Sequence, residues 1–355
     1  MSHVDQQNPD RRTLLRIGAV AGSAAGLGAA GVFGARAANA TAAMQAGSAA
    51  RRPSQASDAN DATHSQHPSY PPHTVDTSHC TPEVADIFRR VFAAKSNHDT
   101  AAFMAHFSTS NPSYSDGTLG LVLSGWQAIN TEFTSLLAGA PAGALSYPLT
   151  IVGDARSASV EFVDTPAFFG AEVRALSSVT FDGNRKITRW VDYWDRRSSL
   201  FPFSDGSAYP TDFHDSAQNA DHAIVQAAQR LQAAFLARDA AAAVALMSAD
   251  VVYEDLAAHT RVRGQLQLQR YYTRALMQLP YGPGAALVHV EGSRQGGGYE
   301  WTASPALAKQ HRGHTAIALD GAGKISRLTT VYDSSLLSYP AYQALVGLAA
   351  EAPQS

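Results

Sequence analysis

VFAAKSNHDTAAFMAHFS at residues 91–108 and LQAAFLARDAAAAVALMS at residues 231–248 are two versions of one segment in this chain of 355 residues. Each version is followed by a Tyr-x-Asp pattern, which reads SYSDG in the first copy and VYEDL in the second. The correspondence lasts to the matched pair Asp195 and Asp333, close to the end of each copy. A repeat of this length indicates two copies of a whole domain rather than a solenoid of small units.

Each copy opens with helical patterns. Apolar residues recur at helical spacing from Val84 to Phe92 and from Ile224 to Phe235, so that one face of each segment is apolar. Thr81-Pro82-Glu83 is a typical helix start, and Asn219 or Asp221 is expected to cap the matching helix. A short second helix follows in each copy. Third helices are predicted over Trp126–Leu137 and Gln265–Leu279.

The rest of each copy is predicted to form strands. They are Leu149–Val152, Ser157–Asp164, Glu172–Phe181 and Lys186–Arg196 in the first copy, and Ala286–Glu291, Gly298–Ala303, His311–Leu319 and Lys324–Asp333 in the second. Asp182-Gly183 and Asp320-Gly321 are hairpin turn signals. Helices followed by antiparallel strands are typical of an α+β fold.

Each half resembles the SnoaL-like branch of the nuclear transport factor 2-like superfamily. The motifs that carry this resemblance are the Tyr-x-Asp strand (Tyr114/Asp116 and Tyr253/Asp255), the glycine before the third helix (Gly125 and Gly264) and the closing Asp-Gly-x-x-Lys-Ile strand. The resemblance covers nearly all of the chain after Cys80. It implies a cone in which a curved sheet wraps a helix and leaves a pocket at the open end. Because the family includes isomerases, dehydratases, epoxide hydrolases, cyclases and non-catalytic binders, the fold does not determine the chemistry.

The predicted fold class is therefore α+β, with two cone-shaped α+β barrel domains whose helices pack in a curved mixed or antiparallel sheet. The predicted organisation is a signal peptide over 1–40, a disordered linker over 41–80, a first domain over 81–203, a linker over 204–219, a second domain over 220–347 and a tail over 348–355. Related domains often pair through their sheets. The two halves are thus expected to form a pseudo-dimer within one chain, and assembly into a homo-oligomer stays open.

The N-terminus has the pattern of a twin-arginine export signal. Asp10-Arg11-Arg12-Thr13-Leu14-Leu15-Arg16 is followed by a Gly/Ala-rich apolar stretch and by a small-x-small cleavage site at Ala38-Asn39-Ala40. The stretch is poor in Leu, Ile and Phe, which favours a removed signal over a membrane anchor. The sequence predicts a periplasmic or secreted protein with no membrane association after signal removal. Residues 41–80 contain few large apolar side chains and are predicted to be disordered.

Composition and motifs argue against several function classes. The formal net charge of −3 at pH 7 disfavours nucleic-acid binding. The single cysteine, Cys80, ends the linker and cannot form an internal disulfide; it is either an inert residue or an exposed thiol open to pairing between molecules. No phosphate loop, dinucleotide fingerprint, nucleophile elbow or HExxH spacing is present. We predict no cofactor and no metal site, although the second copy holds a polar set of Glu254, His259, His289, His311 and His314.

The Tyr-x-Asp strand is the first candidate for chemistry. Alternation along a strand places Tyr114 and Asp116 on one face, and likewise Tyr253 and Asp255. A carboxyl group beside a phenol in an apolar cone is a plausible acid–base pair, because burial raises the carboxyl pKa and the phenol can hold an oxyanion. The alternative is structural, with the aspartate bonded to loop backbone and the tyrosine packed in the wall.

The last strand separates the two copies. Asp192 shares a face with Trp190 and Trp194, whereas Thr330 occupies the matching position of the second copy. The family resemblance implies an acid–base carboxylate on this strand, and Asp192 is the position to which it transfers. The alternative places this face outside the cone, with the tryptophans in a contact between the domains.

Three further residues are candidates for binding a substrate. Arg174 and Arg312 occupy matching positions in the penultimate strands, where an arginine can bind a carboxylate or orient an acid, or simply lie at the surface. His106, on the second helix, is either a pocket acid or a histidine at the rim of the core.

The leading functional prediction is a cofactor-independent acid–base enzyme acting on a small, partly apolar organic molecule by isomerisation, elimination, cyclisation or hydration. Asp192 is the predicted general acid or base, Asp116 a second carboxyl group and Tyr114 the oxyanion donor. Trp190, Trp194, Arg174, His106, Tyr253, Asp255 and Arg312 are the predicted substrate-binding residues. The second hypothesis is a non-catalytic small-molecule-binding or scaffold protein.

Overall fold

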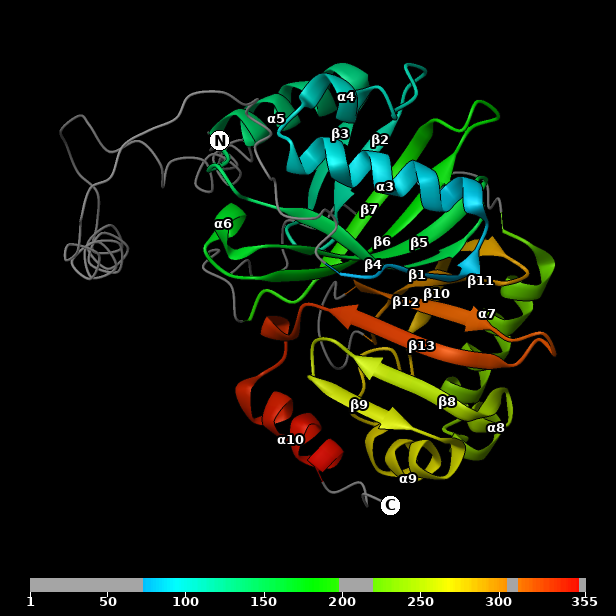
Figure 1. The fold of residues 1–355 in the computed structure, drawn as a ribbon. Coiled ribbons are helices and arrows are strands. Elements are labelled where there is room, and N and C mark those ends of the chain that lie inside the picture. The colour runs from blue at the N-terminus through cyan, green and yellow to red at the C-terminus, as the bar shows by residue number, and fades with distance from the viewer. Residues whose placement is uncertain (1–72, 198–219, 305–311, 351–355) are drawn as a thin grey trace, which may run out of the picture.

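The computed structural model describes residues 73–197, 220–304 and 312–350. These residues form two curved sheets that pack face to face, with helices on the outer side of each sheet (Figure 1). No helix within these ranges is both long enough and apolar enough to cross a membrane. Each sheet and its helices enclose their own large hydrophobic cluster.

The first sheet has seven strands in the order β1-β4-β5-β6-β7-β2-β3. The strands are β1 (Asp76–Cys80), β2 (Ser113–Asp116), β3 (Leu121–Ser124), β4 (Ser146–Gly153), β5 (Ser157–Asp164), β6 (Val173–Phe181) and β7 (Ile187–Trp194). The helices are α3 (Pro82–Ser96), α4 (Thr100–Met104), α5 (Trp126–Gly139) and α6 (Pro166–Phe169). The sheet is mixed, since β1 is parallel to β4 and β2 is parallel to β7.

The second sheet has six strands in the order β10-β11-β12-β13-β8-β9, which matches the first sheet without β1. The strands are β8 (Met247–Asp255), β9 (Thr260–Arg263), β10 (Ala286–Ser293), β11 (Gly296–Thr302), β12 (Arg312–Leu319) and β13 (Ile325–Tyr332). The helices are α7 (His222–Leu236), α8 (Ala240–Ala245), α9 (Gln265–Ala275), α10 (Tyr339–Ala350) and the 3₁₀ helix η2 (Ser334–Leu336). Helices combined with mixed sheets confirm the α+β prediction.

His98-Asp99 and Arg238-Asp239, which occupy matching positions in the repeat, form the turn between the first two helices of each copy. His98 and Arg238 adopt the left-handed conformation, with φ of 56° and 60°. Asp99 and Asp239 then cap α4 and α8, each accepting a hydrogen bond from a backbone N–H three residues later. Both copies need a carboxylate at this position to cap the following helix, which explains why aspartate is present in both. Asp221 likewise caps α7, as predicted, and Asn219 lies outside the described residues.

Two predicted boundaries differ from the structure for physical reasons, and helix α10 extends into the segment predicted as a tail over 348–355. The segment predicted as linker ends in strand β1, because its backbone pairs with β4 although its side chains are mostly polar. Cys80 is consequently buried, and burial raises its pKa to about 11, in agreement with an inert thiol. Helix α9 stops at Ala275 rather than at Leu279, where Pro280 disfavours helical geometry in the preceding residue.

The matched aspartates at the ends of the last strands link the two halves of the chain. Asp195 accepts hydrogen bonds from the backbone N–H and hydroxyl of Ser334 at 2.9 Å. Asp333 forms an ion pair with Arg196, and both side chains are almost fully buried. Each aspartate of the pair therefore has a structural role at the contact between the halves.

Candidate functional site

A cavity lies inside the first copy, between helices α3 and α5 and the sheet. The cavity has a volume of about 60 Å³, which is several times the volume that one buried water molecule needs. Its lining combines apolar rings with acidic, basic and phenolic groups: Lys95, Tyr114, Asp116, Leu119, Phe133, Leu136, Phe162, Asp164, Phe169, Val173, Ala175, Asp192 and Trp194. All three residues predicted to be catalytic are among them.

Strand pairing brings these three residues together. Strand β2 runs parallel to β7, so that Tyr114 lies opposite Trp190 and Asp116 opposite Asp192. Neighbouring strands are about 4.8 Å apart, and residues paired across them share a face of the sheet. Because Asp116 and Asp192 both line the cavity, the face that carries Asp192 is the inner face of the first copy. This settles the orientation that alternation along the strand left open.

Asp192 is held by three donors. The Tyr114 hydroxyl donates to its Oδ2 at 2.6 Å, and the Ser177 hydroxyl and the Trp190 indole N–H donate to Oδ1, each at 2.5 Å. Burial raises the pKa of Asp192 above its ordinary value, although the hydrogen bonds from Ser177 and Tyr114 act in the opposite direction. The phenol proton of Tyr114 is therefore committed to Asp192 in this state.

Asp116 has a different set of partners. Its Oδ1 accepts from the backbone N–H groups of Thr118 and Leu119 at 2.9 and 2.8 Å, and its Oδ2 accepts from the indole of Trp194 at 3.0 Å. Burial raises the pKa of Asp116 to about 7, against the hydrogen bond from Leu119, and the charge of Asp192 acts in the same direction as burial. Two neighbouring carboxyl groups in a dry site titrate as a coupled pair, which keeps a proton available near neutral pH.

Sequence reasoning missed a buried ion pair in the same cavity. The Lys95 ammonium group on α3 contacts both oxygens of Asp164 on β5, at 2.8 and 3.0 Å. Lys95 also lies over the ring of Phe162 and lowers the pKa of Asp192. Comparison of the copies contains the signal, because the positions that match Lys95 and Asp164 in the second copy hold Phe235 and Ala303.

The interior of the second copy is packed with aromatic rings. Asp255 Oδ2 is approached by the hydroxyls of Tyr253, Tyr281 and Tyr332 at 3.2–3.4 Å, and burial raises the pKa of Asp255 to about 6. Tyr271 and Tyr272 fill the adjacent space and are fully buried. Of the pair predicted to bind substrate, Tyr253 thus lies in a packed core, whereas Asp255, although almost fully buried, also lines a polar cleft between the two halves.

The other predicted binding residues occupy different places. Trp194 lines the cavity, whereas Trp190 packs in the core behind it against Phe88 and Phe92. Arg174 lies on the face that the first sheet turns toward the second, bonded to Glu161 and lining a polar cleft of about 320 Å³ between the two halves.

His106 and Arg312 do not line the cavity that contains Asp116 and Asp192. His106 is half-buried at the end of α4, and burial lowers its pKa to about 4, with the charge of Arg90 acting in the same direction. Arg312 begins β12 opposite Thr302.

Comparison with known proteins gives similarity only at the level of solved structures, since no family model and no curated protein matches this chain. A SnoaL-like protein of unknown function from Burkholderia thailandensis is 16% identical, with a TM-score of 0.28 and coverage of 32% of this chain and 96% of that one. A steroid delta-isomerase from Pseudomonas aeruginosa is 14% identical, with a TM-score of 0.29 and coverage of 38% of this chain and 93% of that one. A putative polyketide cyclase from Sinorhizobium meliloti is 25% identical, with a TM-score of 0.26 and coverage of 30% of this chain and 93% of that one.

Proposed function

We propose that this protein is an exported, SnoaL-like acid–base enzyme that acts without a cofactor on a small, partly apolar organic molecule. The observation that carries the proposal is the presence of two buried carboxyl groups, Asp116 and Asp192, in one cavity with apolar walls. A site of this kind retunes its carboxyl groups for proton transfer near neutral pH. Export to the periplasm or the medium rests on the twin-arginine pattern, which lies outside the described residues.

The hydrogen bonds support a division of roles between the two carboxyl groups. Asp116, with a pKa of about 7, is matched to taking a proton from a substrate carbon and returning it at a neighbouring position. Asp192 holds the hydroxyl of Tyr114 and, through its charge, raises the pKa of Asp116. When a substrate oxygen replaces that contact, the Tyr114 hydroxyl becomes a donor to the developing oxyanion.

The walls of the cavity indicate the substrate class. Phe133, Phe162, Phe169 and Trp194 offer aromatic surfaces, and the Lys95 and Asp164 pair adds one polar site. A compact molecule with a carbonyl group next to an acidic C–H, on an otherwise apolar skeleton, fits this chemistry. Isomerisation and elimination by proton transfer are the reactions that two carboxyl groups and a phenol support most directly.

Proton abstraction can be measured before the full reaction is known. The protein is incubated in D₂O with a panel of small cyclic ketones and enones, and exchange of C–H for C–D is followed by NMR. We expect exchange with the wild type and a loss of roughly 10²-fold or more in Asp116→Asn and Asp192→Asn. The matched control is Asp86→Asn, which alters an exposed carboxyl group on α3. Exchange by both cavity variants at the wild-type rate contradicts the proposal.

The packed interior of the second copy favours a second candidate, a non-catalytic binding or scaffold role for that half. A protein that only binds would give a ligand-dependent rise in melting temperature without C–H exchange. We further propose that the face-to-face sheets serve as an intrachain counterpart of a homodimer. Light scattering after size-exclusion chromatography tests whether further copies associate.

A further inference from the structure

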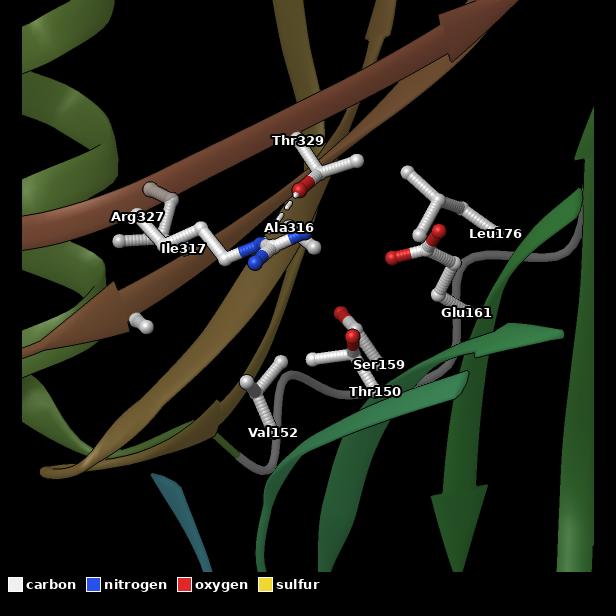
Figure 2. Close-up of a pocket in the computed structure, with 10 residues that line it drawn as sticks. Thr150, Val152, Ser159, Glu161, Leu176, Ala316, Ile317, Arg327 and Thr329 are labelled. Carbon is white, nitrogen blue, oxygen red and sulfur yellow. Dashed lines mark hydrogen bonds between the residues drawn. The ribbon is translucent and has the colours of Figure 1, made fainter. Parts of the chain in front are cut away.

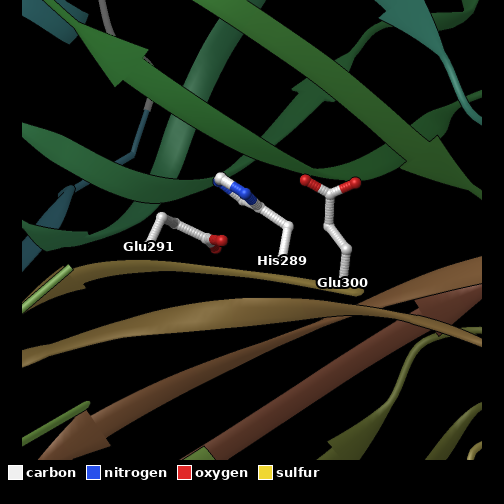
Figure 3. A group of neighbouring side chains, drawn as sticks. All are labelled: His289, Glu291 and Glu300. Carbon is white, nitrogen blue, oxygen red and sulfur yellow. The ribbon is translucent and has the colours of Figure 1, made fainter. Parts of the chain in front are cut away.

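The contact between the two sheets contains a cluster of metal-ligating side chains that the acid–base proposal does not use. His289 and Glu291 on β10 and Glu300 on β11 point from the second sheet toward the first (Figure 3). One ligand atom of each lies within 4.8 Å of the others, and all three side chains are at most 1% exposed. His314 on β12 adds a second imidazole, whose Nε2 lies 2.5 Å from Glu291 Oε1.

Strand register identifies the residues that occupy the same places in the first sheet. Glu300 pairs with His289 on one side and with His314 on the other, and Glu161 pairs in the same way with Thr150 and Leu176. Glu291 pairs with Gly298, two residues before Glu300, and Val152 pairs with Ser159, two residues before Glu161. His289, Glu291 and His314 therefore replace Thr150, Val152 and Leu176.

The equivalent place in the first sheet shows what this position needs for packing alone. Thr150, Val152, Glu161 and Leu176 face Ala316, Ala318, Arg327 and Thr329 across a cavity of about 10 Å³ (Figure 2). A threonine, a valine and a leucine thus suffice to fill one half of this contact. In the other half, three positions have been taken over by two imidazoles and a carboxylate, which are costly to bury.

Groups from the opposite sheet orient the carboxylates of the cluster. Arg189 Nη1 donates to Glu300 Oε1 at 2.5 Å and the Tyr193 hydroxyl donates to Oε2 at 2.7 Å. The Ser159 hydroxyl donates to Glu291 Oε1 at 2.6 Å and the Ser178 hydroxyl to Oε2 at 3.1 Å. Ligating carboxylates in metal sites are held by outer-shell donors in this manner.

We propose that His289, Glu291, Glu300 and His314 bind a divalent metal ion, with zinc as the best match, between the two sheets. Imidazole nitrogens and carboxylate oxygens are zinc ligands, and in tetrahedral geometry ligand atoms about 2.1 Å from the ion lie roughly 3.4 Å apart. The ligand atoms of His289, Glu291 and Glu300 lie within 4.8 Å of one another and His314 Nε2 lies 2.5 Å from Glu291 Oε1, so binding requires the side chains to shift to that spacing. Glu291 and Glu300 each bring a negative charge to the site, and the charge of Glu300 is shared with the Arg189 guanidinium. Because Arg189, Tyr193, Ser159 and Ser178 belong to the first sheet, the ion would fasten the two halves to each other.

The test uses the full chain produced with zinc in the medium. Metal content by mass spectrometry is compared between the wild type and the variant His289→Thr/Glu291→Val/His314→Leu, which installs the side chains that the first sheet already packs at these places. His222→Ala, which removes an exposed histidine on α7, is the control. We expect one additional zinc ion per chain in the wild type and in the control relative to the triple variant. All three proteins keep His64, His67, His73 and His79, so metal bound by these histidines cancels in the comparison.

Two further measurements guard against a variant that folds poorly. X-ray absorption of the wild type should show only nitrogen and oxygen ligands, at about 2.0–2.2 Å. Removal of the metal by a chelator should lower the melting temperature of the wild type and leave that of the folded triple variant unchanged. Equal zinc content in wild type and triple variant overturns the proposal. The proposal is also overturned if the wild type contains no zinc and its melting temperature does not change when zinc is added. In that case the cluster is a network of hydrogen bonds without a metal ion.

Discussion

The buried ion pair between Lys95 and Asp164 allows the strongest quantitative prediction. Both side chains are about nine-tenths buried, and the ammonium group is bonded to both carboxylate oxygens. Removal of one partner leaves a charge in an apolar site, which costs about 3–5 kcal/mol. We therefore expect Lys95→Phe and Asp164→Ala each to lower the free energy of unfolding by that amount.

The double variant Lys95→Phe/Asp164→Ala should behave differently. It places in the first copy the residues that the second copy has at the matching positions, where Phe235 is fully buried. Replacement of a buried ion pair by well-packed apolar groups is often neutral or stabilising. We expect the double variant to lie within about 1 kcal/mol of the wild type, which corresponds to a coupling of several kcal/mol between the two sites.

Urea unfolding followed by tryptophan fluorescence is the appropriate assay. Three of the four tryptophans, Trp126, Trp190 and Trp194, lie in the first copy and report on its unfolding. Arg90→Ala is the control, since its ion pair with Asp86 is exposed and should contribute less than about 1 kcal/mol. Destabilisations that simply add in the double variant would refute the reasoning, because they would show that the two charges do not stabilise each other.

Three other outcomes follow from the buried groups. Asp116 has a pKa of about 7 in place of 3.8, so the folded state keeps a proton that the unfolded state releases; wild-type stability should fall by up to about 1.4 kcal/mol per pH unit between about pH 4 and 7, and urea titrations of Asp116→Asn should lack this contribution. Cys80 should not react with a thiol reagent at pH 8 until urea unfolds the protein, and rapid labelling of the folded protein would contradict its burial and raised pKa. Arg196→Met leaves Asp333 buried without its ion-pair partner and should cost about 3–5 kcal/mol in urea unfolding, whereas Arg156→Met, at an exposed arginine, should cost less than about 1 kcal/mol.

The sequence pattern predicted most of the helices and strands, because the matching segments of the two copies indicate the same secondary structure. Apolar spacing predicted helices α3 and α7, and the Asp-Gly signals located the turns before β7 and β13. Alternation along β7 correctly grouped Asp192 with Trp190 and Trp194. It could not say which face of the sheet is the inner one, because that depends on the helices that pack against it from elsewhere in the chain.

The contacts that sequence reasoning missed are long-range or depend on backbone pairing. Lys95 and Asp164 are far apart in sequence, and neither belongs to a motif. Strand β1 has polar side chains, so no apolar pattern marks it, and its pairing with β4 is made by the backbone. Of the four residues in the cluster around Glu300, the polar set noted in the sequence of the second copy contains only His289 and His314, and their convergence with Glu291 and Glu300 requires the register of three strands.

The two copies differ most where packing alone would not require it. The first keeps a cavity with Asp192 and the Lys95 and Asp164 pair, whereas the second replaces these residues by Thr330, Phe235 and Ala303 and fills the interior with tyrosines. At the contact between the sheets the opposite holds, because there the second copy has polar residues where the first copy has mostly apolar ones. A dry interior tolerates a buried charge only with a compensating partner, so each polar set must be retained as a unit. In the first copy the polar residues that packing does not require line its cavity, and in the second copy they lie at the contact with the first.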